Sequence, residues 1–258
     1  MIRLKSRAQI ETIAAAGAIV AEVLELASAT VRPGISTGEL DAAAEELIRS
    51  HPGASPAFKG LYGFPATLCT SVNDEVVHGI PSCAKVLAEG DIVSVDVGVR
   101  LDGLFADAAV TLAVGAILPA TQDLLDVTSR SLAIGVDAAM PGDRLGDLGC
   151  AIQACVEASG YSIIRELVGH GVGEAPHEEP QVPNFGTPGR GPRMERGLVI
   201  AIEPMVNQGR RDIRTLDDEW TVVTADGSLS AHFEHTVAVT EDGPQILTTV
   251  RSGSPAGE

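Results

Sequence analysis

The chain has 258 residues, of which 45% are hydrophobic and only 3% aromatic, so its core must consist mainly of Ala, Val, Ile and Leu side chains. Lys and Arg total 18 against 35 Asp and Glu, which gives a formal net charge of −17. Such a surface repels a phosphate backbone, and direct nucleic-acid binding is therefore not expected. The question is which carboxylates are solvated surface and which are gathered around cations.

Cysteine usage and the N-terminal segment indicate the compartment. The four cysteines form no Cys-x-x-Cys pair, which predicts reduced thiols and a cytoplasmic protein. The basic segment Met1–Arg7 is not followed by the short apolar run and cleavage site of a signal peptide. Glu11, Glu22 and Glu25 interrupt the apolar stretch 10–31 and argue against a membrane-spanning helix there. We expect no membrane partner.

The first part of the chain predicts two helices followed by strands. Apolar residues recur at three- and four-residue steps over 10–27, which is typical of a long amphipathic helix. The sequence Ser36-Thr37-Gly38-Glu39 has the form of a capping box and predicts a second helix that runs through Ile48. Short β-rich runs follow, and Asp102-Gly103 is a strong hairpin signal between the last two: 67–72, 91–100 and 104–114.

The same order of elements returns in the second part. Helical patterning covers 121–140 and 143–159. Strand-like runs follow at 198–202, 220–224, 236–240 and 245–249. We expect one domain over residues 1–250, with internal halves of about 1–115 and 116–250, and a frayed tail over 251–258.

An internal repeat supports this division. The pattern Pro-Gly-x-x-x-Gly-acid-Leu occurs at 33–40 and again at 141–148. At nearly the same offset, 89–96 and 195–203 each contain an apolar strand that begins after a glycine and ends on a carboxylate. A duplicated α+β unit explains two agreeing segments better than chance similarity between Ala- and Gly-rich stretches. Asp96 and Glu203 would then occupy related places near a pseudo-two-fold axis.

Two aspartates are predicted to lie side by side on one hairpin. If Asp102-Gly103 makes the turn, Asp107 pairs with Gly98, one step along the same face from Asp96. Diagonal neighbours stand roughly 7–8 Å apart, so both side chains can reach one ion. The alternative is two exposed acids, but the sequences around them are apolar. Buried like charges this close require separated pKa values or a cation.

Three further residues carry the same chemistry. His170 lies between glycines, and His177-Glu178-Glu179-Pro180 follows seven residues later. Glu203 ends one apolar strand and Glu234 begins another. A single histidine is more often a structural residue than a ligand, so each motif alone is weak evidence.

Together, Asp96, Asp107, His170, Glu203 and Glu234 resemble the ligand set of the type I methionine aminopeptidases, which belong to the pita-bread metallopeptidases. The matching stretches are Ser71–Pro81, the two aspartates eleven residues apart, Gly169–Gly173, His177–Val182, Ile202–Met205 and Glu234–Thr236. The resemblance covers nearly the whole chain, which looks like the minimal bacterial form. It implies the α+β pita-bread fold, a duplicated helix-helix-strand unit around a central antiparallel sheet.

The resemblance also implies a dinuclear metal centre. Four carboxylates and one neutral imidazole carry a charge of −4, which two divalent cations balance, and the donor set suits Mn, Fe, Co or Zn. In the family Asp107 and Glu234 bridge the metals, Asp96 completes one site, and His170 with Glu203 completes the other.

Three residues receive catalytic roles by the same resemblance. Glu203 is expected to be the general base. His177 is expected to hydrogen-bond the carbonyl oxygen as it becomes an oxyanion, and His78 to contact the scissile nitrogen. His51, His232 and His235 are assigned no role.

The methionine pocket is expected to be formed by Phe58, Leu61, Tyr62, Phe64, Cys69 and Trp220, with His78 and His177 also contacting substrate. Phe58, Leu61 and Phe64 fit an ordinary core equally well. Phe58 and Leu61 stand where relatives more often carry Cys and Tyr, Pro176 replaces a usual Phe, and Ala108 stands where a hydroxyl usually follows. These departures leave the ligands untouched, but they leave open a paralogue with altered first-residue preference.

We therefore expect a cytoplasmic, monomeric aminopeptidase that removes the initiator methionine from newly made proteins whose second residue is small. Whether it works docked at the ribosome stays open. One alternative is a related exopeptidase for X-Pro bonds, although those relatives usually carry a further N-terminal domain. A non-catalytic binding module would have lost ligands, and a structural Ca²⁺ site does not explain His170 or His177.

Overall fold

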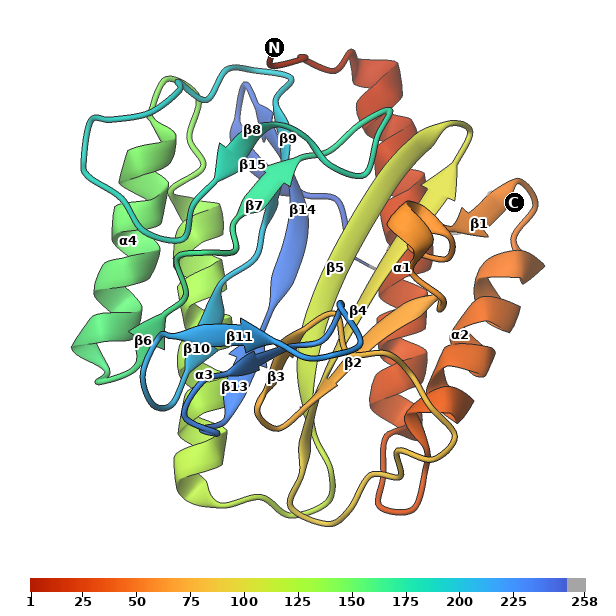
Figure 1. The fold of residues 1–258 in the computed structure, drawn as a ribbon. Coiled ribbons are helices and arrows are strands. Elements are labelled where there is room, and N and C mark those ends of the chain that lie inside the picture. The colour runs from red at the N-terminus through yellow and green to blue at the C-terminus, as the bar shows by residue number, and fades with distance from the viewer. Residues whose placement is uncertain (250–258) are drawn as a thin grey trace, which may run out of the picture.

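The computed structural model describes residues 1–249 and shows a curved sheet with four helices on its outer face (Figure 1). The first pair of helices is α1 (Arg7–Thr30) and α2 (Thr37–Ser50), and the second pair is α3 (Pro119–Asp137) and α4 (Leu145–Ala158). The predicted tail 251–258 lies outside the described residues. No helix in residues 1–249 is both long enough and apolar enough to cross a bilayer.

The main sheet is antiparallel and has nine strands in the order β1-β4-β5-β14-β9-β7-β8, with β2 on β4 and β15 on β14. Its strands are β1 (Ala54–Pro56), β2 (Leu68–Val72), β4 (Ile92–Leu101), β5 (Leu104–Ala113), β7 (Gly169–Gly171), β8 (Glu178–Val182), β9 (Val199–Ile202), β14 (Glu234–Thr240) and β15 (Gly243–Ile246). The pairing of β5 with β14 joins strands from the two predicted halves. The predicted central antiparallel sheet is confirmed.

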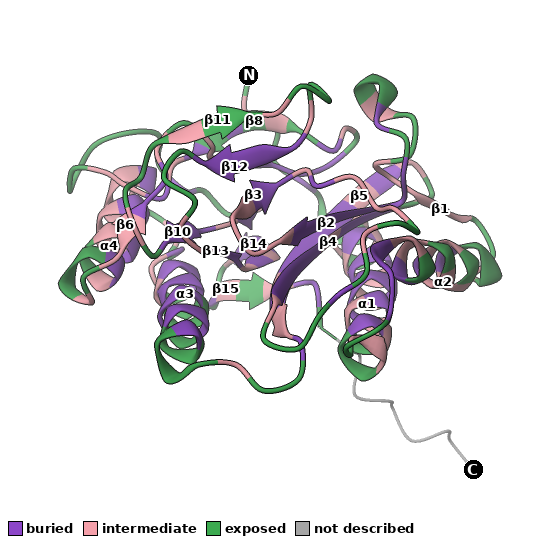
Figure 2. Ribbon diagram, turned by 60° about the horizontal axis from the view of Figure 1, so that its bottom comes forward, coloured by how far each residue is buried: buried purple, intermediate pink, exposed green. Residues whose placement is uncertain are grey.

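Two small sheets complete the structure, and Figure 2 shows strands of both on the side of the main sheet away from the helices. One contains β6 (Ser162–Ile163), β10 (Met205–Asn207) and β13 (Ser230–His232), and the other contains β3 (Glu75–Val77), β11 (Ile213–Thr215) and β12 (Val222–Thr224). A 3-10 turn, η1 (Leu61–Gly63), lies between β1 and β2.

Local sequence sets the helix starts and the central hairpin. The Ser36 side chain accepts from the Glu39 amide at the start of α2, and the Glu39 carboxylate accepts from the Ser36 amide. The predicted capping box is therefore confirmed. Asp102 (φ 48) and Gly103 (φ 83) both have left-handed backbone, as the turn of a two-residue hairpin with twisted strands requires. Gly98 pairs with Asp107, and the predicted register is confirmed.

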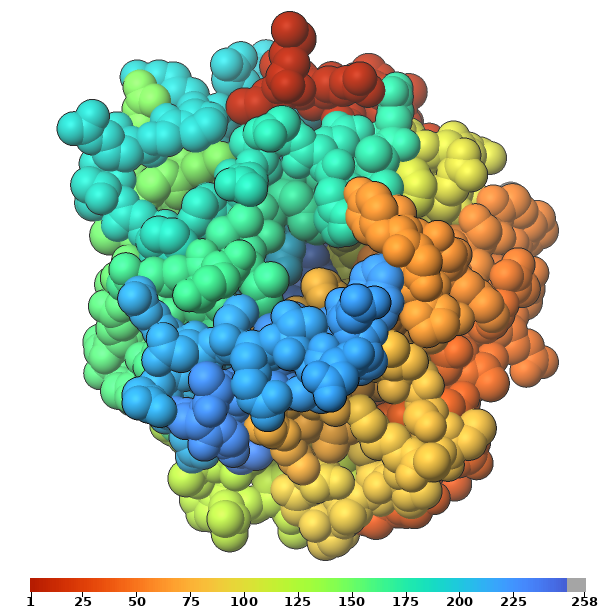
Figure 3. Space-filling view, viewed as in Figure 1, coloured from red at the N-terminus to blue at the C-terminus, as the bar shows by residue number. Residues whose placement is uncertain are grey.

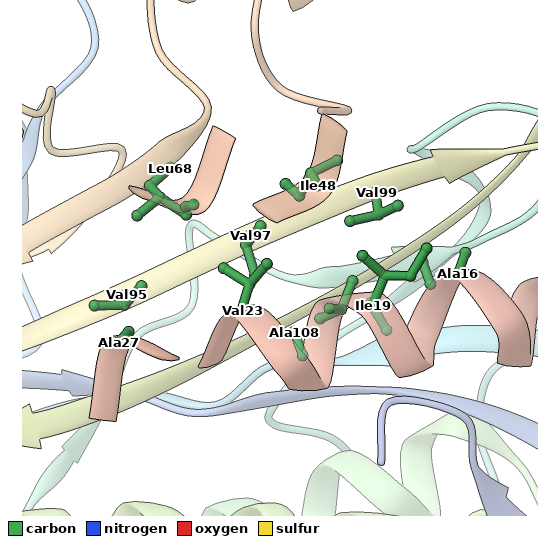
Figure 4. Packing of buried hydrophobic residues seen from close by; sticks show 14 of the residues in the cluster. Ala16, Ile19, Val23, Ala27, Ile48, Leu68, Val95, Val97, Val99 and Ala108 are labelled. Carbon is green, nitrogen blue, oxygen red and sulfur yellow. The ribbon is translucent and has the colours of Figure 1, made fainter. Parts of the chain in front are cut away.

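Small and β-branched side chains form the core, as the composition predicts. Ala16, Ile19, Val23 and Ala27 of α1 face the valines of β4 in Figure 4. A second cluster packs α3 and α4 against β9 and β14. Alanine at the contact positions lets α1 lie close to the sheet. Because side chains alternate along a strand, Asp96 of β4 points to the face opposite Val95 and Val97.

The two copies of the repeated motif make the same backbone contacts. Gly34 N donates to Leu87 O and Gly142 N donates to Met194 O, both at 2.8 Å. Gly38 N donates to Ser82 O at 3.1 Å and Gly146 N to Arg190 O at 3.0 Å. A side chain at Gly38 or Gly146 would collide with the backbone of the following loop, so close approach explains both repeated glycines.

Differences from the predicted elements lie at the edges. The helix predicted over 121–140 ends at Asp137, and the strand predicted over 220–224 begins at Val222, because Asp218 accepts from the Trp220 and Thr221 amides and forms a turn there. The strand predicted over 245–249 is β15, Gly243–Ile246. The short strands β1, β3, β6, β7, β8, β10, β11 and β13 were not predicted, since two to five residues show too little periodicity.

Candidate metal centre and active site

A cavity of about 600 Å³ opens on the concave face. In Figure 3 it lies among η1, the β7–β8 region and the β11–β12 region. It is lined by every residue that the sequence assigned to the site, namely Phe58, Leu61, Tyr62, Phe64, Cys69, His78, Asp96, Asp107, His170, His177, Glu203, Trp220 and Glu234. Residues up to 176 positions apart in the chain are thus brought together (58 to 234).

The five predicted metal ligands come from five strands of the main sheet. Asp96 lies on β4, Asp107 on β5 and His170 on β7, while Glu203 directly follows β9 and Glu234 begins β14. Ligand atoms of Asp107, His170 and Glu234 lie within 4.8 Å of one another. His170 Nε2 is 3.6 Å from Asp107 Oδ2 and 3.5 Å from Glu203 Oε1.

Burial raises the free energy of the ionised carboxylates in this cluster. Asp107 and Glu234 are each 3% exposed. Burial, followed by the charge of Asp107, raises the pKa of Asp96 well above its usual range. Burial and the neighbouring carboxylates raise the pKa of Glu203 and of Glu234 in the same way.

The donor set fits divalent cations. Within residues 1–249, neither Lys nor Arg is among the residues that line the cavity, so no side-chain cation there neutralises the acids. Asp96 Oδ1 is buried without a hydrogen-bond partner. Carboxylate oxygens with one imidazole nitrogen are ligands for Mn, Fe, Co and Zn, and a metal would supply the missing partner and the missing charge.

Polar contacts that the sequence did not predict hold two of the ligands, Asp107 and His170, in place. Thr236 Oγ1 donates to Asp107 Oδ1 at 2.8 Å and accepts from the Asp107 amide at 3.0 Å. His170 Nδ1 lies 3.0 Å from Gly171 O, which leaves Nε2 to face the carboxylates. The sequence signal for Thr236 was its position two residues after Glu234, on the same face of β14.

The two predicted catalytic histidines lie beside the acids. The centroids of the His177 and His170 rings are 4.5 Å apart at an interplanar angle of 87°, and the exposed Tyr62 ring is stacked with the His177 ring at 6.2 Å between centroids. Partial burial, with His170 next to it, lowers the pKa of His177 to about 4. His78 packs edge-on against Trp220 at 6.5 Å, and burial lowers its pKa. Both imidazoles are therefore neutral near pH 7.

An apolar wall borders the acids. Phe64, Cys69 and Ala66 are buried in one cluster, with Phe58 and Trp220 packed against it. The Phe64 and Trp220 rings meet at 5.1 Å and 70°. The two interpretations of the Phe residues are therefore compatible, since the same rings are core and cavity lining.

Tyr62 and Leu61 line the cavity outside that cluster. Tyr62 is 77% exposed and has a left-handed backbone (φ 52). Its ring is nearly parallel to the His177 ring, at an interplanar angle of 10°. Its ring is therefore available to a bound peptide at the rim.

The structure adds one histidine to the cavity. His232 was assigned no role, yet it lines the cavity, is 2% exposed, and its Nε2 has no hydrogen-bond partner. That nitrogen lies 3.9 Å from Glu203 Oε2. Thr111 Oγ1 bonds both the amide and the carbonyl of His232 and so fixes its backbone. The sequence signal for His232 was its position two residues before Glu234.

The other two histidines without an assigned role lie elsewhere. His51 Nε2 pairs with Glu22 at 3.0 Å, and His235 Nδ1 lies 2.8 Å from Thr248 Oγ1. Neither lines the cavity.

Comparison with known proteins agrees with this geometry. The metallopeptidase family M24 model matches residues 11–241. A methionine aminopeptidase of Clostridium perfringens is 53% identical, over 97% of this chain and 100% of its own length. Methionine aminopeptidase 1 of Bacillus subtilis is 50% identical, over 97% and 100%.

Solved structures give the same result. The crystal structure of methionine aminopeptidase from Thermotoga maritima superposes with a TM-score of 0.95 at 45% identity, covering 96% of this chain and 100% of that chain. The prolidase from Pyrococcus furiosus shares the fold, with a TM-score of 0.78 at 23% identity, but this chain covers only 65% of it. The chain belongs to the metallopeptidase family M24, among its methionine aminopeptidases.

Proposed function

We propose that this chain is a dinuclear metallo-aminopeptidase that hydrolyses the bond after an N-terminal methionine when the second residue is small. One observation carries the proposal: a buried set of four carboxylates and one imidazole lies beside an apolar wall in the same cavity. The acids suit hydrolysis with metal ions, and the wall suits an unbranched apolar side chain.

Asp96, Asp107, His170, Glu203 and Glu234 would hold two divalent ions, whose charge of +4 balances the four carboxylates. Such ions supply Lewis acidity toward the scissile carbonyl and activate water as the nucleophile. Since ligands come from both predicted halves, we treat residues 1–250 as one catalytic domain.

Glu203 is the proposed general base. It directly follows β9, its Oε1 lies 3.5 Å from His170 Nε2, and it lines the cavity. It takes a proton from the attacking water and delivers one to the leaving amine as the C–N bond breaks.

The two neutral histidines would act on the peptide group. His177, on the rim beside His170, donates an N–H to the carbonyl oxygen as negative charge develops there. His78, next to Trp220, contacts the scissile nitrogen. Neutral imidazoles can donate without bringing a further positive charge beside the metals.

The methionine side chain would lie against Phe58, Phe64, Cys69 and Trp220. The thioether is flexible and polarisable, and contact with aromatic rings stabilises it. Leu61 and Tyr62 would border its entrance.

The substrates are then the N-terminal peptides of newly made proteins. We place the reaction in the cytoplasm, where those peptides appear and where the four free cysteines stay reduced. Action as a monomer, with or without the ribosome, belongs to this proposal.

The test is a set of assays with Mn, Fe, Co or Zn on Met-Ala, Met-Gly, Leu-Ala and Ala-Pro peptides. We expect cleavage of the two Met peptides only. Preferred cleavage of Ala-Pro would favour the X-Pro alternative, and preferred cleavage of Leu-Ala would favour a paralogue with altered preference.

The base is tested by E203Q, which should lower kcat on Met-Ala by about 10²–10⁴-fold. E241Q is the control, because Glu241 is an exposed glutamate paired with Arg196 on the surface. Activity of E203Q equal to that of E241Q would overturn the assignment of Glu203.

A further inference from the structure

Lys5, which precedes α1, has an unusual environment for a lysine. Its side chain is only 4% exposed, and in residues 1–249 no other lysine or arginine is buried. Its Nζ lies 2.7 Å from Glu178 Oε2 and donates to Arg3 O at 3.1 Å. Its own amide donates to Gly197 O at 2.6 Å. A buried lysine requires such partners, since an unpaired buried charge is strongly destabilising.

Glu178, the partner of Lys5, organises the loop that ends at His177. Its side chain is 9% exposed. Its second oxygen, Oε1, accepts from the amides of Glu174 at 2.7 Å and Ala175 at 3.2 Å. The carboxylate thereby closes the loop 174–177 onto the start of β8. His177 is the residue immediately before Glu178, so the position of its imidazole depends on this closure.

Two glycines lie so close to the Lys5–Glu178 ion pair and the Lys5 backbone that neither position can hold a side chain. A Cβ at Gly173 would collide with Lys5 Cε and would lie 2.7 Å from Glu178 Oε1. A Cβ at Gly197 would lie 2.8 Å from Lys5 O. Gly173 O also accepts from the Phe105 amide at 3.0 Å, which anchors the base of the loop to β5. Both glycines are therefore required by the path of the N-terminal segment.

We propose that Lys5 is a positioning residue for His177, acting through Glu178. The proposal rests on the proposed function, in which His177 contacts the carbonyl oxygen. Without the ammonium group, the buried Glu178 carboxylate loses its counter-charge and moves toward water. The loop 174–177 then loses the acceptor that closes it, and the imidazole leaves the geometry that catalysis needs.

The test is K5M, which removes the ammonium group and leaves the Glu178 carboxylate without its counter-charge. We expect kcat on a Met-Ala peptide to fall by about 10–100-fold, with KM and the bound metal per chain unchanged. Hydrogen exchange at the Glu174 and Ala175 amides should become faster. If K5M does not fold, K5M/E178M, which leaves no unpaired charge and no acceptor for the two amides, is measured in the same way.

The matched control is R3Q. Arg3 pairs with Glu174 at 3.0 Å and joins the same two segments, but its side chain is 65% exposed. We expect wild-type kcat and exchange rates from R3Q, because exposed ion pairs contribute little. An equal loss in R3Q would show that any link between these segments matters, which would overturn the assignment to Lys5.

A double-mutant cycle with H177A separates this proposal from the proposed function. If Lys5 acts through His177, K5M lowers kcat in the wild type but not in the H177A background. The same fold loss in both backgrounds, or unchanged kcat in K5M beside an impaired H177A, would overturn the positioning role alone. Full activity of H177A would overturn the role of His177 in the proposed function, and the positioning role with it.

Discussion

At the scale of single residues, the buried acids depend on partners that lie far away in the sequence. Asp107 and Thr236 are 129 positions apart, yet the Thr236 hydroxyl accepts from the Asp107 amide and shares its one hydrogen between the Asp107 carbonyl and Oδ1. The hydroxyl of Thr236 satisfies the Asp107 amide and also holds its carboxylate. A single hydroxyl thus sets both the backbone and the ligand atom of a metal-binding residue.

We expect T236V to lower both stability and metal affinity. It would leave the Asp107 amide buried without an acceptor, at a cost of about 1–3 kcal/mol in the free energy of unfolding. Loss of the contact to Oδ1 should weaken metal binding by about 10–100-fold. Urea unfolding in chelator and calorimetric metal titration measure the two effects.

T240V is the control on the same strand. Thr240 Oγ1 bonds Gly243 O in the β14–β15 turn, away from the cavity. The metal affinity of T240V should equal that of the wild type. A T236V affinity equal to that of T240V would contradict the role given to Thr236.

At the scale of elements, helix propensity and tertiary contacts can favour different residues at the same position. Gly17 is unfavourable in the middle of α1, because glycine costs a helix interior about 1 kcal/mol relative to alanine. In the structure its missing side chain is required, since a Cβ there would collide with the carbonyl oxygen of Leu247. The strand β15 can therefore lead the chain back against α1.

G17A should consequently destabilise the protein, although helix propensity alone predicts a gain. Because the obstacle is backbone, relief requires α1 or the Leu247 segment to move, and overpacking of this kind costs about 1–3 kcal/mol. The free energy of unfolding in urea measures the balance. S28A, at an exposed position later in α1, should be neutral or slightly stabilising. A G17A variant with a higher free energy of unfolding than the wild type would contradict the expected cost of this contact.

At the scale of the whole molecule, the halves meet where the charge is most concentrated. Asp96 and Asp107 come from the β4–β5 hairpin, whereas His170, Glu203 and Glu234 come from strands after α4. Bringing them together places like charges in a buried cavity, and metal ions would offset that repulsion. Two divalent ions would change the formal charge from −17 to −17 + 4 = −13.

Metal removal should therefore destabilise the entire fold. At a free metal concentration 100 times the Kd, each site adds about 2.7 kcal/mol to the free energy of unfolding. This corresponds to roughly 5–10 °C in Tm per site for a chain of this size. Thermal unfolding with Mn²⁺ or with chelator, together with metal content per chain, provides the measurement. One ion per chain would contradict a dinuclear centre, and an unchanged Tm would contradict coupling of metal binding to folding.

Much of this architecture follows from local patterns. Ser36 with Glu39 determines a helix start, Asp102-Gly103 determines the hairpin turn, and the turn fixes Asp107 opposite Gly98. These features need only neighbouring residues, because caps and two-residue turns satisfy their own backbone groups. Resemblance to a known ligand set added the residues that no local pattern connects.

Only the tertiary structure decided the rest. His232 lies beside Glu203 because β13 pairs with β10, and Lys5 reaches Glu178 because the N-terminal segment lies against the loop before β8. Short strands such as β7 and β13 leave no periodic signal, and partners far apart in sequence leave none at all. The sequence by itself determined the acids, the hairpin and the repeated glycines. Packing between distant segments decided which polar groups remained without partners, and hence which residues surround the acids.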